Sequence, residues 1–165
     1  MQLTEAQILK IVGQIESVLA TPSKFKTWLE NKQPGQWVGM AQERCKCPVA
    51  EFAAEALDST FALSNKVEVS SVDVSGEEIE FALLTPSNDY FVIRLRKSLD
   101  DDRFPLWFFN EEEVFTTSPI SLGNYNWIGD FVHWIDNEEN YRPENKSLKV
   151  SPRLALQILE KVNPS

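Results

Sequence analysis

Histidine, cysteine and glycine are scarce in this chain, which has one histidine, two cysteines and six glycines. A closed structural zinc site uses four ligands, chiefly cysteine and histidine, so the chain holds too few of them for a site of the usual kind. The glycines are dispersed and form neither a phosphate-binding Gly-x-x-x-x-Gly-Lys pattern nor a Gly-x-Ser-x-Gly nucleophile pattern. These absences disfavour the familiar zinc, nucleotide and acyl-transfer enzymes, and we expect neither a metal nor a cofactor.

Basic charge and long apolar runs are also lacking. Lysine and arginine number 16 against 25 aspartate and glutamate residues, a formal net charge of -9. This excess disfavours direct binding to nucleic acid or anionic lipid, because both reward clustered cations. No apolar run approaches the ~20 residues that span a bilayer, and the first residues lack the pattern of a secretory signal. We therefore expect a cytoplasmic protein that binds no membrane.

Core-forming side chains, by contrast, are abundant. Hydrophobic residues make up 42% of the chain and aromatic residues 11%, including five tryptophans and ten phenylalanines. A chain of 165 residues with this composition is large enough to bury one core without metals or disulfides. No repeat, low-complexity tract or Gly/Ser linker divides it, so we predict a single globular domain over residues 1–165.

The first part of the chain has the spacing of helices. Thr4 and Gln7 form a capping-box pattern ahead of apolar residues that recur every three or four positions. The run Thr21-Pro22-Ser23 predicts the start of a second helix, which should end near Gln33-Pro34-Gly35. A third helix is predicted over about Pro48 to Leu57, because proline is favoured at the first helical position.

The apolar period changes to two near Asn65, which predicts a central antiparallel sheet over about residues 65–109. The first strand changes parity near Ser70-Ser71, where we expect a β-bulge. Turn residues separate the strands that follow, so the sheet should be a meander with one buried face.

The segment 110–123 has no settled period and is predicted to be irregular. An amphipathic helix should follow over about Tyr125 to Asn137, with His133 off its apolar stripe and in solvent beside carboxylates. Ser151 should cap a last helix, with Pro152 at its first position. Helices, then strands, then helices indicate an α+β fold, with the C-terminal helices packed on the sheet.

The most specific chemical feature is the run Arg44-Cys45-Lys46-Cys47-Pro48. Cys47 would stand at a helix start, where backbone N–H groups and nearby cations favour the thiolate, and Cys45 could be its resolving thiol. One alternative is metal binding, by two such pairs across a dimer or with Glu43 or Glu51 completing a site. The other is that one or both cysteines pack under the third helix as small hydrophobic side chains, as free cysteine most often does.

A second feature is the aromatic and acidic segment 104–113. Consecutive aromatic residues on one strand cannot all face the same side, so either a helix covers the second side or some rings are exposed. If exposed, they form a partner-binding surface, for which the candidates are Trp107, Phe108, Glu111, Glu112 and Glu113. Such a surface suits a partner with an apolar pocket or a basic face.

Since no enzyme pattern is complete, we expect a non-catalytic protein that binds another protein as an adaptor, inhibitor or regulatory subunit. One alternative is a thiol-dependent redox or metal-binding protein that uses Cys45 and Cys47. Another is an acidic decoy that blocks a nucleic-acid-binding partner. The layout of three runs is similar to that of short bacterial proteins, a resemblance that implies no activity. The runs are Phe25-x-x-Trp28-Leu29, Val38-Gly39 and Cys47-Pro48-Val49-Ala50.

Overall fold

The first helix begins at the capping box that the sequence predicts. The computed structural model describes residues 4–76, 78–96, 106–110, 113–116, 126–137 and 148–163. The Thr4 hydroxyl accepts the Gln7 backbone N–H at 3.2 Å, and the Gln7 side chain accepts the Thr4 N–H at 2.8 Å. Helix α1, Glu5–Leu19, follows and turns an apolar stripe into the core. Its buried residues are Ile8, Ile11, Val12, Ile15 and Leu19.

Helices α2, Ser23–Glu30, and α3, Pro48–Asn65, complete the N-terminal part. The prediction that α3 ends at Leu57 is wrong. The polar residues after Leu57 form one further turn, and the helix continues beyond them. Phe61 lies beyond that turn and is fully buried. The helix ends where Lys66 adopts a left-handed conformation, with φ at 55°.

The predicted antiparallel sheet is present. Its strands are β2, Glu68–Val74, β3, Glu78–Leu84, β4, Tyr90–Arg96, β5, Leu106–Asn110, and β6, Glu113–Thr116, hydrogen-bonded in that order. The register of β2 on β3 shifts between Val69 and Ser71, which confirms the predicted bulge. The prediction that 110–123 is irregular is wrong for β6. This short strand forms by pairing with β5, and its sequence shows no alternation of apolar and polar residues that would predict it.

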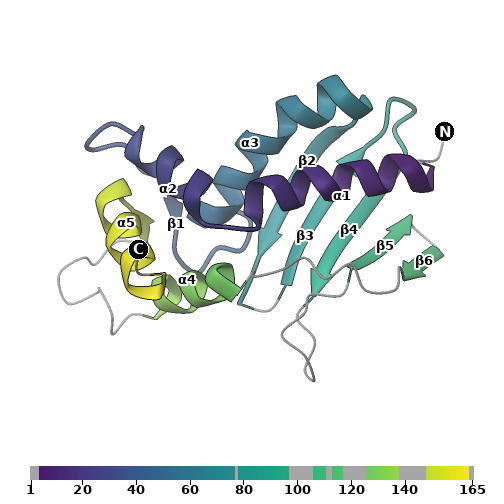
Figure 1. The fold of residues 1–165 in the computed structure, drawn as a ribbon. Coiled ribbons are helices and arrows are strands. Elements are labelled where there is room, and N and C mark those ends of the chain that lie inside the picture. Colours follow the sequence, from purple (N-terminus) through teal and green to yellow (C-terminus); the bar gives the residue numbers. More distant parts are fainter. Residues whose placement is uncertain are drawn as a thin grey trace.

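Helices α1 and α3 lie across one face of this sheet (Figure 1). Alternate residues of β3, Ile79, Phe81 and Leu83, are buried beneath them. On the other face Arg94 of β4 forms ion pairs with Glu78 and Glu80 at 3.0 and 2.7 Å. The buried residues of the helices and the covered face form one core cluster.

The remaining elements gather at one end of the sheet. Helix α4, Asn126–Asp136, is followed by α5, Pro152–Val162, which packs against both α2 and α4 (Figure 1). Strand β1, Gly39–Met40, pairs with β7, Lys149–Val150, in a separate two-stranded sheet. The α+β class, with helices before and after a central antiparallel sheet, is confirmed. Among the helices of the described ranges, none has both the length and the apolar character that crossing a bilayer requires.

An aromatic cluster fixes this end of the molecule. Phe25 of α2 contacts Phe52 of α3, with ring centroids 5.4 Å apart, and Trp127 and Phe131 of α4, at 5.6 and 5.2 Å. The Trp127 indole N–H donates to the Leu19 carbonyl at 2.9 Å. Helices α2, α3 and α4 are therefore held together by packed aromatic rings.

Candidate functional site

Cys47 is the N-cap residue of α3 rather than an accessible thiol. Its sulfur accepts the Ala50 backbone N–H at 3.4 Å, and the residue is only 2% exposed. Burial raises the pKa of its thiol from 9.0 to about 12, although the N–H groups of the helix start act in the opposite direction. The expectation that the helix start lowers this pKa is therefore wrong, because desolvation of the thiolate is the larger effect.

Cys45 is exposed, on a loop with many backbone hydrogen bonds. The Met40 N–H donates to the Lys46 carbonyl at 2.7 Å, and the Val74 N–H donates to the Arg44 carbonyl at 2.9 Å. Both cysteines are free thiols, one in solvent and one in the core. In the part of the chain that the structure describes, no group of three or more His, Cys, Asp or Glu side chains is placed to hold a metal ion.

His133 lies on the exposed side of α4, as predicted. Its ring covers Gly76, where an added Cβ would come within 2.5 Å of it. Among the described residues it forms no hydrogen bond to Cys47, whose sulfur is used by Ala50. A catalytic Cys-His pair is thus not assembled here.

The described backbone of the predicted partner-binding segment forms β5 and the start of β6, the last two strands of the five-stranded sheet. Trp107 is paired with Arg94 and Phe108 with Ile93, while Glu113 begins β6. Glu111 and Glu112 lie outside the described residues. The proposed role of these residues in binding stays a prediction.

A hollow of about 450 Å³ lies beside β1, and we call it the Trp37 hollow. Trp37 is 52% exposed, with the Lys149 ammonium 5.7 Å from its ring centroid. Trp28 lines the other side, where its indole N–H donates to Glu55 at 3.0 Å and Lys32 lies 4.4 Å above its ring. The hollow offers one exposed aromatic ring among side chains of both charges.

Two adjoining cavities of about 480 and 960 Å³ lie between α2 and α5 and together form what we call the α2–α5 groove. They share Leu156 and Glu160. The smaller is next to the start of α2 and the end of α5, and the larger next to the end of α2 and the start of α5, so the groove follows an antiparallel helix pair. Its apolar lining consists of Pro22, Leu29, Pro34, Pro152, Leu156 and Leu159.

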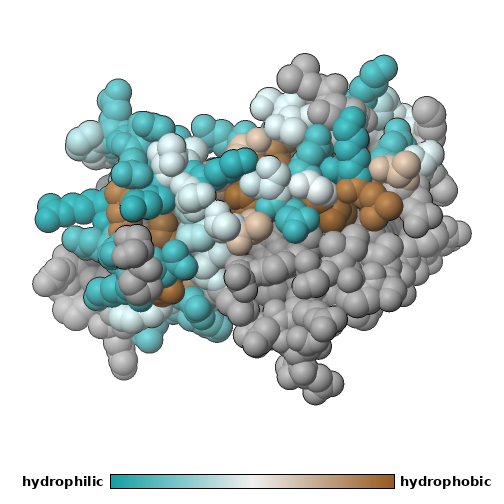
Figure 2. Space-filling model, in the orientation of Figure 1, coloured by the Kyte–Doolittle hydropathy of each residue, from teal (hydrophilic) through white to brown (hydrophobic). Residues whose placement is uncertain are grey.

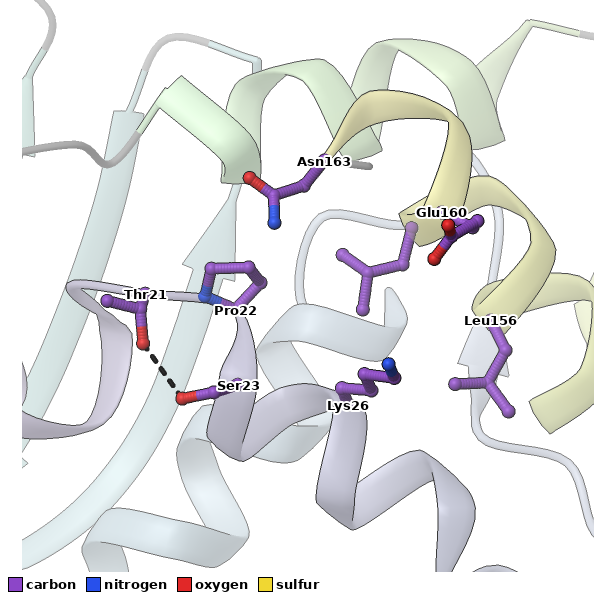
Figure 3. Close-up of a pocket in the computed structure, with 8 residues that line it drawn as sticks. Thr21, Pro22, Ser23, Lys26, Leu156, Glu160 and Asn163 are labelled. Carbon is purple, nitrogen blue, oxygen red and sulfur yellow. Dashed lines mark hydrogen bonds between the residues drawn. The ribbon is translucent and has the colours of Figure 1, made fainter. Parts of the chain in front are cut away.

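The rim of this groove carries charged side chains, namely Lys26, Glu30, Lys32, Arg153, Glu160 and Lys161. Figure 3 shows Lys26 and Leu156 directed into the smaller cavity from opposite helices, with Glu160 on the α5 side. The surface at this end shows hydrophobic residues among hydrophilic ones (Figure 2). An apolar trough with a charged rim can bind a side chain or a helix, but it holds no nucleophile and base in contact.

Comparison with known proteins identifies no relative, because no family model, curated protein or solved structure matches the chain. The groove was not predicted from the sequence either. Its one sequence signal is Leu156, an apolar residue outside the helical stripe of Leu154, Ala155, Ile158, Leu159 and Val162. In the structure Leu156 is partly buried and packs against the core beside that stripe. Such a residue becomes informative only when the helix that lies beside it is known.

Proposed function

We propose that this protein is a non-catalytic binding protein that docks an amphipathic helix of a partner protein in the α2–α5 groove. The proposal is based on the apolar lining of this groove. Leu29 and Leu159 form a buried floor, and Leu156 remains partly exposed beside them. Exposed apolar surface in a concave site between two helices is the kind of surface that receives the apolar face of a third helix.

The dimensions of the groove suit a helix of about three turns. Helix α5 contributes 11 residues, Pro152–Val162, which correspond to about 16 Å at the usual rise per residue. A partner helix of similar length presents apolar residues at positions i, i+3, i+4 and i+7 on one face. Leu156, at the middle of α5 and common to both cavities, would contact the centre of that face.

The thiol-dependent alternative has weaker support. Burial and the raised pKa of Cys47 leave Cys45 as the single accessible thiol, without a resolving partner. The cytoplasm remains the location that we propose, because two free thiols suit a reducing compartment.

Site-specific photo-crosslinking in the native cell tests the proposal. Benzoylphenylalanine is placed at Gln157, an exposed residue of the groove, and in a control at Lys10, an exposed residue of α1. We expect a protein that is captured from position 157, is not captured from position 10, and is lost when Leu156→Gln is added. Identical products from both positions, or products that survive Leu156→Gln in a folded protein, would contradict docking in the groove.

The captured protein is then purified and titrated by calorimetry against wild type and Leu156→Gln. The partly exposed side chain of Leu156 should contribute at least about tenfold in Kd, or roughly 1.4 kcal/mol. Thermal unfolding of the variant separates a lost contact from a lost fold, since Leu156 is only partly buried.

A further inference from the structure

The charge of the α2–α5 groove differs in sign from that of the chain. The whole chain has 25 acidic residues against 16 basic ones. The groove, in contrast, is lined by four cations, Lys26, Lys32, Arg153 and Lys161, and two anions, Glu30 and Glu160. A local excess of positive charge on an acidic protein attracts a partner of opposite sign to this place rather than elsewhere.

The cations at the two ends of the groove are the ones available to a partner. Lys26 lines the smaller cavity and Arg153 the larger, and neither forms an ion pair with any residue that the structure describes. The other two cations already contact side chains of this protein. Lys32 lies 3.5 Å from Glu55, and the Lys161 ammonium lies 5.0 Å from the ring centroid of Trp134.

We infer, on the basis of the docking function proposed above, that the partner helix is acidic and carries carboxylates beyond both ends of its apolar stripe. The carboxylate at one end meets Lys26, and the carboxylate at the other end meets Arg153. The apolar stripe between them contacts Leu156 and Leu159. Arg153 can hold its carboxylate by two parallel N–H donors, whereas Lys26 acts as a point charge.

The two kinds of contact contribute differently. Apolar contact in the groove supplies most of the affinity, because exposed ion pairs at a rim are worth little in water. The cations speed the encounter with acidic helices and repel basic ones, so they set which partner binds. Glu30 and Glu160 line the same groove and repel a partner's carboxylates. The partner's acids are therefore best placed beside Lys26 and Arg153.

Two fluorescent peptides of about 14 residues test this inference. Both carry leucines at i, i+3, i+4 and i+7 and a hydrocarbon staple that fixes the helix, and they differ only in having glutamates or lysines beyond each end of the stripe. Binding is measured by fluorescence anisotropy at low and high salt. We expect the glutamate peptide to bind about tenfold more tightly than the lysine peptide at low salt, with the difference shrinking at high salt.

The double variant Lys26→Glu/Arg153→Glu should reverse this preference. Its control, Lys10→Glu/Lys46→Glu, changes the net charge equally at residues outside the groove and should preserve it. If wild type binds both peptides equally, the charge inference is overturned while docking of a helix stands. The charge inference is also overturned if neither peptide binds, or if the protein self-associates and the glutamate peptide cannot dissociate it. In either case the crosslinking from Gln157 decides separately whether a protein docks in the groove.

Discussion

The sulfur of Cys47 accepts the backbone N–H of Ala50, in the position that a serine, threonine or aspartate oxygen usually occupies at a helix start. The same arrangement recurs in α5, where the Ser151 hydroxyl accepts the Leu154 N–H at 3.1 Å. In both helices a proline follows the capping residue. The cysteine thus has a structural explanation that requires no chemistry at its sulfur.

The effect of replacing Cys47 on stability should depend on whether the new side chain can still cap α3. Cys47→Ser keeps an acceptor for the Ala50 N–H and should retain the fold, whereas Cys47→Ala loses the acceptor and buried volume. We expect Cys47→Ala to lower the free energy of unfolding by roughly 1–3 kcal/mol. Urea denaturation of both variants measures it. Equal stability of wild type and Cys47→Ala would show that the cap contributes nothing.

Alkaline pH should destabilise wild type more than Cys47→Ser. The folded-state pKa of about 12 lies above the value of 9.0 for a free thiol, so the unfolded chain releases its proton first as pH rises. The contribution of the neutral thiol is fully present below pH 9.0 and is lost progressively as pH rises from 9.0 to about 12. Urea denaturation at about pH 8 and about pH 10 should show an extra loss of about 1 kcal/mol in wild type. Parallel pH profiles for the two proteins would refute the raised pKa.

Thiol labelling should distinguish the two cysteines. In the native protein Cys45 should react with a maleimide at the rate of an exposed thiol, and Cys47 should react only on unfolding, because it is 2% exposed. This order is the reverse of what the helix-start argument alone predicts. Mass spectrometry of tryptic peptides, with urea-unfolded protein as the control, measures both rates. Fast native labelling of Cys47 would restore the thiol-dependent alternative.

Two glycines should respond oppositely to alanine. A Cβ at Gly39 would lie 2.5 Å from the Lys46 carbonyl oxygen, so Gly39→Ala must displace the loop that carries Cys45. Gly13, inside α1, has nothing within 4 Å of such a Cβ. Gly13→Ala should therefore raise the free energy of unfolding by about 0.5–1 kcal/mol, and Gly39→Ala should lower it. Denaturation midpoints that shift in the same direction would contradict this close contact.

Two tryptophans should contribute very differently to stability. Trp127 is 4% exposed and donates a hydrogen bond to Leu19, so Trp127→Ala should cost about 3–5 kcal/mol. Trp37 is 52% exposed, so Trp37→Ala should cost no more than about 1 kcal/mol. Acrylamide quenching should fall more on loss of Trp37 than on loss of Trp127. A large destabilisation by Trp37→Ala would mean that the Trp37 hollow is part of the folded core.

The sequence predicts best the features that neighbouring residues determine. The capping box of Thr4 and Gln7, the helix start at Pro48 and the bulge before Ser71 all depend on contacts or parity within a few residues. Two pairings that have no local signal are not predicted. Pairing of Gly39 with Val150 joins strands too short to have a period, and β6 became a strand only through its pairing with β5.

The candidate sites follow the same rule, since their local features can be predicted from the sequence and their long-range features cannot. Cys47 was correctly placed at a helix start, but its pKa depends on core residues that pack over it, and these come from elsewhere in the chain. The α2–α5 groove requires Pro22 and Leu156, far apart in sequence, to meet across an antiparallel helix pair. No local pattern contains that information.

Docking in the α2–α5 groove is tested most directly by following the backbone amide signals of ¹⁵N-labelled protein as the glutamate-flanked peptide is added. We expect saturable shifts concentrated in α2, Ser23–Glu30, and α5, Pro152–Val162, and their loss in Leu156→Gln. Shifts confined to β5 and β6, or no shifts at concentrations where the peptide binds, would contradict it and return the partner surface to Trp107, Phe108 and the neighbouring glutamates.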